Sequence, residues 1–140
     1  MIAFRTAIRD ALDEELANDE RVSAREGVNA RYLDAGDLPV GRFDLIVADL
    51  SFISLALVLP ALVPLAAGEL LLLVKPQFEL QPANIGKGGI VRDAAAYARV
   101  EQKLRLACDA CGLDVVDWFA SAIEGGDGNR EFFLRARGRP

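Results

Sequence analysis

The sequence predicts an α/β fold, with a mostly parallel sheet that ends in an antiparallel C-terminal strand. Two short apolar runs, residues 45–48 (LIVA) and 70–74 (LLLLV), are bounded by polar residues, as expected of strands buried on both faces of a parallel sheet. Strand and helix patterns alternate around them, which is typical of this class. The 140 residues fit one domain with a substantial core.

The first half of the chain predicts a helix and a strand before the first buried strand. Residues 7–18 (AIRDALDEELAN) carry apolar residues near helical spacing and acidic residues on the other face. Residues 21–27 (RVSAREG) are a short, half-polar strand candidate. Residues 42–50 (RFDLIVADL) contain the first apolar run and are predicted to form a buried strand.

A helix is predicted to follow that strand. Ser51 or Ser54 can cap its N-terminus, and the helix is expected to run to about Ala66, kinked or ended by two prolines. The remaining elements are a buried strand, an irregular loop rich in proline and glycine, a helix capped by Asp93, and two strands joined by a turn. They are assigned to residues 69–75, 77–92, 93–112, 113–121 and 131–137.

Composition removes several classes of function. The formal net charge of -5 gives no general attraction to phosphate backbones, although Lys87 and Arg92 flank a glycine-rich loop and leave a local basic patch open. Four more arginines crowd the last eleven positions, namely Arg130, Arg135, Arg137 and Arg139. The sequence contains no histidine, which excludes Ser-His and Cys-His nucleophiles and most metal sites. No metal is therefore predicted.

The two cysteines and one apolar stretch have competing interpretations. Cys108 and Cys111 could suggest a redox pair or half a zinc site, but they fall in a helical pattern without a second ligand pair, so core or half-buried thiols are predicted. Residues 53–74 are apolar enough to resemble a membrane span, yet Pro60 and Pro64 interrupt them. Without a secretory leader, a cytoplasmic protein is expected.

Three charged residues are predicted to converge at one edge of the sheet. Asp49 and Lys75 each follow a buried strand, and ligands of open α/β sheets bind at the carboxyl ends of the strands. Glu131 begins an antiparallel strand that would start on the same rim if it lay beside the Lys75 strand. A lysine between two carboxylates can hold or pass a proton, which suits activation of a hydroxyl nucleophile. In the alternative interpretation, Asp49 caps a helix, Lys75 is solvated and Glu131 belongs to a surface turn.

Four segments carry a resemblance to a known family. ADLSFISL, LVKPQFE, GKGGIVRD and GDGNREFFL, in this order and spacing, resemble the haemolysin-like TlyA family of ribosomal RNA ribose 2'-O-methyltransferases, of the FtsJ type. The similarity runs from about residue 19 to residue 137. It implies a Rossmann-like class I methyltransferase fold, S-adenosylmethionine as cofactor, and ribosomal RNA or a ribosomal subunit as partner.

The resemblance also implies roles for individual residues. Asp49, Lys75 and Glu131 match three members of a Lys-Asp-Lys-Glu tetrad around the target ribose. Lys75 would help to deprotonate the 2'-hydroxyl, while Asp49 and Glu131 would position the lysine and tune it electrostatically. Asp49 would also face the methionine end of the cofactor. Glu26 and Asn29 are candidates for contacts near the adenosine.

The sequence departs from the family at its N-terminal end. The first lysine of the tetrad, an S4-like RNA-binding domain and the first strand with its glycine-rich cofactor turn have no counterpart, and Thr6 stands where the next strand's acidic residue is expected. Residues 1–140 are therefore predicted to be a partial methyltransferase domain, inactive alone, whose strand 42–50 has an unpaired edge that could self-associate. Two alternatives are a catalytically silent RNA-binding remnant and a membrane-active haemolysin.

Overall fold

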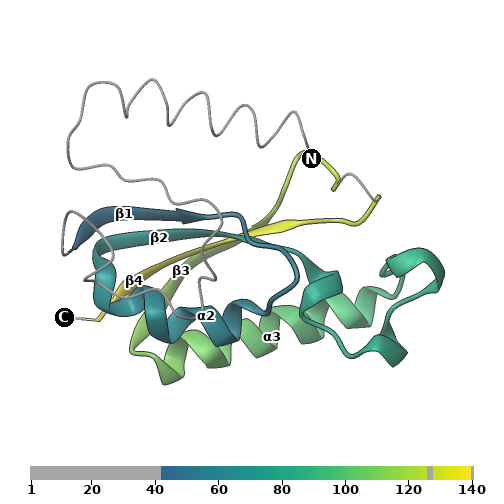
Figure 1. Cartoon of the computed structure of the whole chain (residues 1–140), viewed down its shortest axis with the longest axis horizontal. Coiled ribbons are helices and arrows are strands. Elements are labelled where there is room, and N and C mark those ends of the chain that lie inside the picture. The colour runs from purple at the N-terminus through teal and green to yellow at the C-terminus, as the bar shows by residue number, and fades with distance from the viewer. Residues whose placement is uncertain (1–41, 126–127, 140) are drawn as a thin grey trace.

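A computed structural model of the chain describes residues 42–125 and 128–139, which form a mixed four-stranded sheet with two α-helices against one face (Figure 1). The α/β class predicted from the alternation of elements is confirmed. The predicted helix 7–18 and strand 21–27 lie outside the described residues. They stay predictions.

The strands lie in the order β1-β2-β4-β3. Their bounds are β1 Phe43–Ala48, β2 Ala66–Val74, β3 Leu113–Ala120 and β4 Phe132–Gly138. β1 and β2 are parallel, whereas β4 is antiparallel to both β2 and β3. Three strands thus run in one direction and the C-terminal strand opposes them, as predicted. Because β4 is inserted between β2 and β3, however, the sheet has one parallel pair and two antiparallel pairs.

β1 lies at one end of this order, and within the described part of the chain it pairs only with β2. Leu45 in β1 is 55% exposed, and the other residues of the strand are largely apolar. An apolar strand edge of this kind is a template for pairing with another strand. Self-association through this edge therefore stays a prediction.

Helix α2 (Leu55–Leu62) begins at a capping serine and ends at the start of a proline-containing turn. The Ser54 hydroxyl accepts a hydrogen bond from the Ala56 N–H at 3.2 Å, so Ser54 is the N-cap that the sequence left open. A 3₁₀ turn (Val63–Leu65) with Pro64 follows the helix. The helix thus ends before Ala66, which is instead the first residue of β2.

Gly68 explains why β2 starts three residues earlier than predicted. A Cβ atom at this position would lie 2.2 Å from the Asp44 carbonyl oxygen of β1, so only glycine allows the two backbones to approach here. Gly68 thus allows a close contact between two parallel strands.

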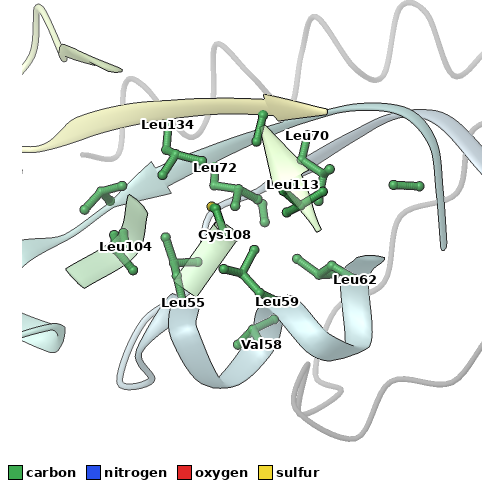
Figure 2. Packing of buried hydrophobic residues seen from close by; sticks show 14 of the residues in the cluster. Leu55, Val58, Leu59, Leu62, Leu70, Leu72, Leu104, Cys108, Leu113 and Leu134 are labelled. Atoms are coloured by element: carbon green, nitrogen blue, oxygen red, sulfur yellow. The ribbon is translucent and has the colours of Figure 1, made fainter. Parts of the chain in front are cut away.

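Helix α3 (Ala94–Ala110) is capped by Asp93, as predicted. The Asp93 carboxylate accepts a hydrogen bond from the Ala95 N–H at 2.9 Å. Every fourth residue of one face is buried: Ala96, Val100, Leu104 and Cys108. This face packs with α2 and the sheet into one apolar cluster, whose leucines lie between the helices and the strands (Figure 2).

The loop between β2 and α3 contains three 3₁₀ turns, at Pro76–Phe78, Pro82–Asn84 and Lys87–Gly89. Gly88 and Gly89 both have a φ of 78°, in the left-handed region that glycine adopts without strain. Most of residues 81–90 are exposed. The irregular loop predicted from its prolines and glycines is confirmed.

Cys108 is a core thiol and Cys111 is a half-buried one, in agreement with the prediction of core or half-buried thiols. Cys108 is fully buried, Cys111 is half-buried, and both are free. Burial raises the pKa of the Cys108 thiol to about 11. Within residues 42–125 and 128–139, no helix is both long and apolar enough to span a bilayer.

At about pH 8, a thiol with this pKa is only about 0.1% ionised, and the thiolate is the reactive form. We expect iodoacetamide to label Cys111 in the native protein much faster than Cys108, and to label both equally in urea, as checked by peptide mass spectrometry. Equal labelling of the two cysteines in the native protein would contradict the buried position of Cys108.

The raised pKa of Cys108 contributes to the stability of the fold, a contribution that is complete below about pH 9 and is lost as the pH rises toward 11.

Candidate active site

Asp49 and Lys75 lie at the same end of the sheet because their strands are parallel. Asp49 directly follows β1 and Lys75 directly follows β2. Ala48 and Val74 are the last residues of the two strands, and both belong to the core between the sheet and the helices. Since side chains alternate along a strand, Asp49 and Lys75 leave the sheet toward its other face.

Lys75 is buried and paired. Its ammonium nitrogen Nζ lies 2.5 Å from Asp49 Oδ1 and donates a hydrogen bond to Ser51 Oγ at 2.9 Å, and Lys75 is 2% exposed. A lysine withdrawn from water needs such partners, because an unpaired buried charge is strongly destabilising. The alternative of a solvated Lys75 is therefore wrong. Asp49 is not a helix cap either, since Ser54 fills that position.

Glu131 lies at the same rim. Val74 of β2 pairs with Phe132 of β4, so Lys75 and Glu131 occupy the next facing positions beyond the last pair of the ladder. Both Val74 and Phe132 are directed toward the helices, which directs their neighbours Lys75 and Glu131 to the other face. Glu131 is 3% exposed, so the alternative of a surface turn is wrong for this residue. The structure thus brings the three predicted residues to one rim, while their catalytic roles stay predictions.

Glu79 is a buried carboxylate that the sequence reasoning did not assign to a site. It accepts hydrogen bonds from Ser54 Oγ at 2.5 Å and from the Leu55 N–H at 2.8 Å, at the N-terminus of α2. The Lys103 ammonium of α3 donates to a Glu79 carboxylate oxygen at 3.1 Å and to the Glu79 carbonyl oxygen at 2.8 Å. Glu79 therefore fastens the turn that follows Lys75 to both helices.

Asn129 is the second buried polar residue that was missed, although it lies in the GNRE segment. Its Oδ1 accepts a hydrogen bond from the Val91 N–H and its Nδ2 donates to the Gly89 carbonyl oxygen, both at 2.8 Å. Asn129 is fully buried. It joins the segment before Glu131 to the glycine-rich loop, a contact across about forty residues that local pattern cannot reveal.

Phe52 is an exposed aromatic residue three positions after Asp49. It is 90% exposed and has a φ of 64°, a left-handed conformation that is strained for a bulky side chain. The centre of the Phe52 ring lies 5.0 Å from the centre of the Phe78 ring. The two rings line an open hollow of about 670 Å³ together with Ser54, Glu79 and Lys103.

Two of the three predicted cofactor contacts cannot be placed. Glu26 and Asn29 lie outside the described residues, whereas Asp49 lies at the rim with one carboxylate oxygen on Lys75. Among the described residues, no group of three acidic or cysteine side chains is arranged to hold a metal ion. The described part of the site is therefore a cluster of one cation and two carboxylates.

A sheet of this topology, with charged residues at the carboxyl ends of its parallel strands, defines the chain as an α/β domain of the kind that binds ligands at this rim. Residues 5–138 match the FtsJ-like methyltransferase family. The chain belongs to this family, as the resemblance predicted.

The chain is similar to two proteins that are named as rRNA methyltransferases. The chain is 45% identical over 124 residues to the "16S/23S rRNA (cytidine-2'-O)-methyltransferase TlyA" of Mycobacterium tuberculosis, an alignment that covers 87% of this chain and 46% of the relative. It is 41% identical to the "Putative rRNA methyltransferase YqxC" of Bacillus subtilis, over 86% of this chain and 43% of the relative. The chain thus spans about half the length of the curated relatives it matches.

A solved structure has the same fold. A crystal structure from Lactococcus lactis, described as that of a candidate hemolysin, superposes with a TM-score of 0.79 at 35% identity. The superposition covers 89% of this chain and 61% of that chain. The Rossmann-like methyltransferase fold predicted from the four motifs is therefore confirmed for this chain.

Proposed function

We propose that this chain carries the proton-accepting half of an S-adenosylmethionine-dependent methyltransferase that acts on a ribose 2'-hydroxyl of ribosomal RNA. The observation that carries the proposal is the buried contact between Lys75 and Asp49, at the rim that Glu131 also reaches. The printed names of the relatives supply the substrate class. Such a protein works in the cytoplasm, where ribosomal RNA is found.

The three side chains have separate tasks in this proposal. The Lys75 ammonium first passes a proton to the Asp49 carboxylate at 2.5 Å, and the resulting neutral amine accepts the proton that leaves the 2'-hydroxyl as its oxygen attacks. Lys75 is withdrawn from water and so is held in one position. Asp49 and Ser51 fix the orientation of the Lys75 nitrogen through their 2.5 and 2.9 Å contacts. Glu131 adds a second carboxylate at the rim, which helps to hold the Lys75 nitrogen in position. When bound, S-adenosylmethionine supplies the electrophilic methyl group.

Phe52 supports a nucleic-acid substrate. Exposed aromatic rings bind bases by stacking, with a contribution of about 1–3 kcal/mol for each base. The Phe52 ring is 90% exposed and follows the Asp49 position by three residues. A base stacked there would belong to a nucleotide close to the Lys75 nitrogen.

The test is transfer of a labelled methyl group from S-adenosylmethionine to ribosomal RNA, followed by mapping of the modified ribose through its resistance to alkaline cleavage. The chain alone is expected to give no transfer. A chimera in which residues 42–140 replace the matching segment of the Mycobacterium tuberculosis relative is expected to methylate a ribose. An inactive but folded chimera that still binds RNA would favour the second candidate function, an RNA-binding protein without transfer activity.

Binding of the cofactor is a separate prediction. The resemblance implies a glycine-rich turn that binds this cofactor, and residues 1–140 contain no segment that matches it. We expect the chain to bind S-adenosylmethionine weakly or not at all in isothermal titration calorimetry, and the chimera to bind it measurably. Micromolar affinity of the chain alone would contradict this expectation.

The membrane-active alternative is retained only as an outcome to be tested, because one relative, from Brachyspira hyodysenteriae, carries the name "Hemolysin A". In a flotation experiment with liposomes, this protein is expected to stay in the unbound fraction. Flotation with the liposomes would favour the haemolysin alternative over the methyltransferase proposal.

A further inference from the structure

Arg92 and Arg130 lie on two segments that the buried amide of Asn129 joins. Because this amide bonds both Val91 and Gly89, it fixes the backbone on either side of the contact. Arg92 is the residue after Val91, and Arg130 is the residue after Asn129; both are exposed. Two segments far apart in the sequence therefore present a cation each at the same contact.

The side chain of Arg130 is oriented by aromatic rings. Its guanidinium carbon lies 5.6 Å from the centre of the Tyr97 ring and 5.8 Å from that of the Phe132 ring. The Tyr97 hydroxyl donates a hydrogen bond to the Val91 carbonyl oxygen at 2.6 Å, so the ring is tied to the same loop. A guanidinium that lies against rings keeps its N–H edge for an acceptor, and its planar fork matches a phosphate.

The charges of these two arginines are not balanced locally. Neither forms an ion pair with a carboxylate of the described residues, whereas Arg135 and Arg139, further along the chain, pair with Glu69 and with Asp109 and Asp114. The two acidic neighbours are already engaged elsewhere. Asp93 caps α3, and Glu131 is buried on the other side of β4. Two exposed cations on joined segments, neither in an ion pair with a described carboxylate, favour a bound anion.

We propose that Arg92 and Arg130 bind the phosphodiester backbone of the RNA substrate beside the site, and that Asn129 and Tyr97 are the positioning residues of this pair. The inference rests on the proposed function for the identity of the polymer. It assigns to this pair the task of holding the strand next to the Lys75 rim, since Arg130 directly precedes Glu131. Phosphate contacts fix the register of a nucleic acid without reading its sequence.

The experiment measures binding of a short, fluorescein-labelled single-stranded RNA of mixed sequence by fluorescence anisotropy, at a series of potassium chloride concentrations. The logarithm of the binding constant falls with the logarithm of salt by about 0.7 per phosphate contact on single strands. We expect Arg92→Gln and Arg130→Gln each to lower that slope by about 0.7, and the double variant to lower it by about 1.4. Arg105→Gln is the matched control, because Arg105 is exposed and paired with Glu101 on α3.

A wild-type slope in the double variant, or no RNA binding by the wild-type chain, would overturn the inference. Inorganic phosphate that binds the wild type but not the double variant, with an unchanged RNA slope, would assign the pair to a small phosphate ligand and would also overturn it. Methyl transfer is scored separately in the chimera. A lower salt slope in the double variant, together with a chimera that transfers no methyl group, would support the arginine contact and reject the proposed function. A wild-type slope in the double variant, together with an active chimera, would reject the arginine contact and support the proposed function.

Discussion

Replacing Lys75 with alanine in the active chimera is expected to lower methyl transfer to ribosomal RNA by about 10²- to 10⁴-fold, the usual contribution of a positioned acid or base. The nitrogen of Lys75 lies 2.5 Å from Asp49 Oδ1. Its loss removes the acceptor of the ribose proton. It also leaves the Asp49 and Glu131 carboxylates without the cation between their strands, which adds repulsion at the rim.

Lys75→Arg separates proton transfer from charge. Arginine keeps the positive charge beside Asp49 but stays protonated at any working pH, so it cannot accept the proton. We expect this variant to fold and to be as inactive as Lys75→Ala, as measured by initial rates of methyl transfer at saturating RNA. Arg105→Gln, on the exposed face of α3, is the control with wild-type rates. Undiminished transfer by Lys75→Ala would remove Lys75 from the mechanism.

Glu79→Ala is expected to lower the free energy of unfolding by about 2–4 kcal/mol, because it leaves several donors at a buried position without their acceptor. The Glu79 carboxylate accepts from Ser54, from the first residue of α2 and from Lys103. Its loss would release the N-terminus of α2 from the turn that carries Lys75. Transfer in the chimera is expected to fall as well, because the position of Lys75 depends on this turn.

Urea unfolding followed by circular dichroism checks this prediction. Glu79→Gln is expected to lose less stability than Glu79→Ala, because its amide oxygen can still accept from the Leu55 N–H. Glu101→Ala is the matched control: Glu101 is also paired with a basic residue, but the pair is exposed on one helix, so the change is expected to be about 0.5 kcal/mol or less. A loss for Glu79→Ala no larger than that of the control would show that the turn does not depend on this carboxylate.

Much of the fold follows from local pattern. The runs LIVA and LLLLV locate β1 and β2 because short apolar runs bounded by polar residues favour strands, although β1 is not buried on both faces as predicted, since Leu45 is 55% exposed. Asp93 starts α3 because its carboxylate can accept from the N–H two residues further on. The start of β2 could not be predicted in this way. Gly68 is a helix breaker in isolation, and only the approach of Asp44 on the neighbouring strand shows why a strand requires it.

The candidate site, like the fold, could be predicted only in part. By itself, the sequence determined that Asp49 and Lys75 end parallel strands and that Glu131 begins an opposing one, since these are properties of strand order and direction. Only the tertiary structure decided that Lys75 is buried on Asp49 and Ser51, that Glu79 holds its turn, and that Asn129 fixes the loop beside Glu131. These contacts join residues 24 to 40 positions apart. Burial and pairing across such separations depend on how the elements pack, and no local pattern of residues encodes that packing.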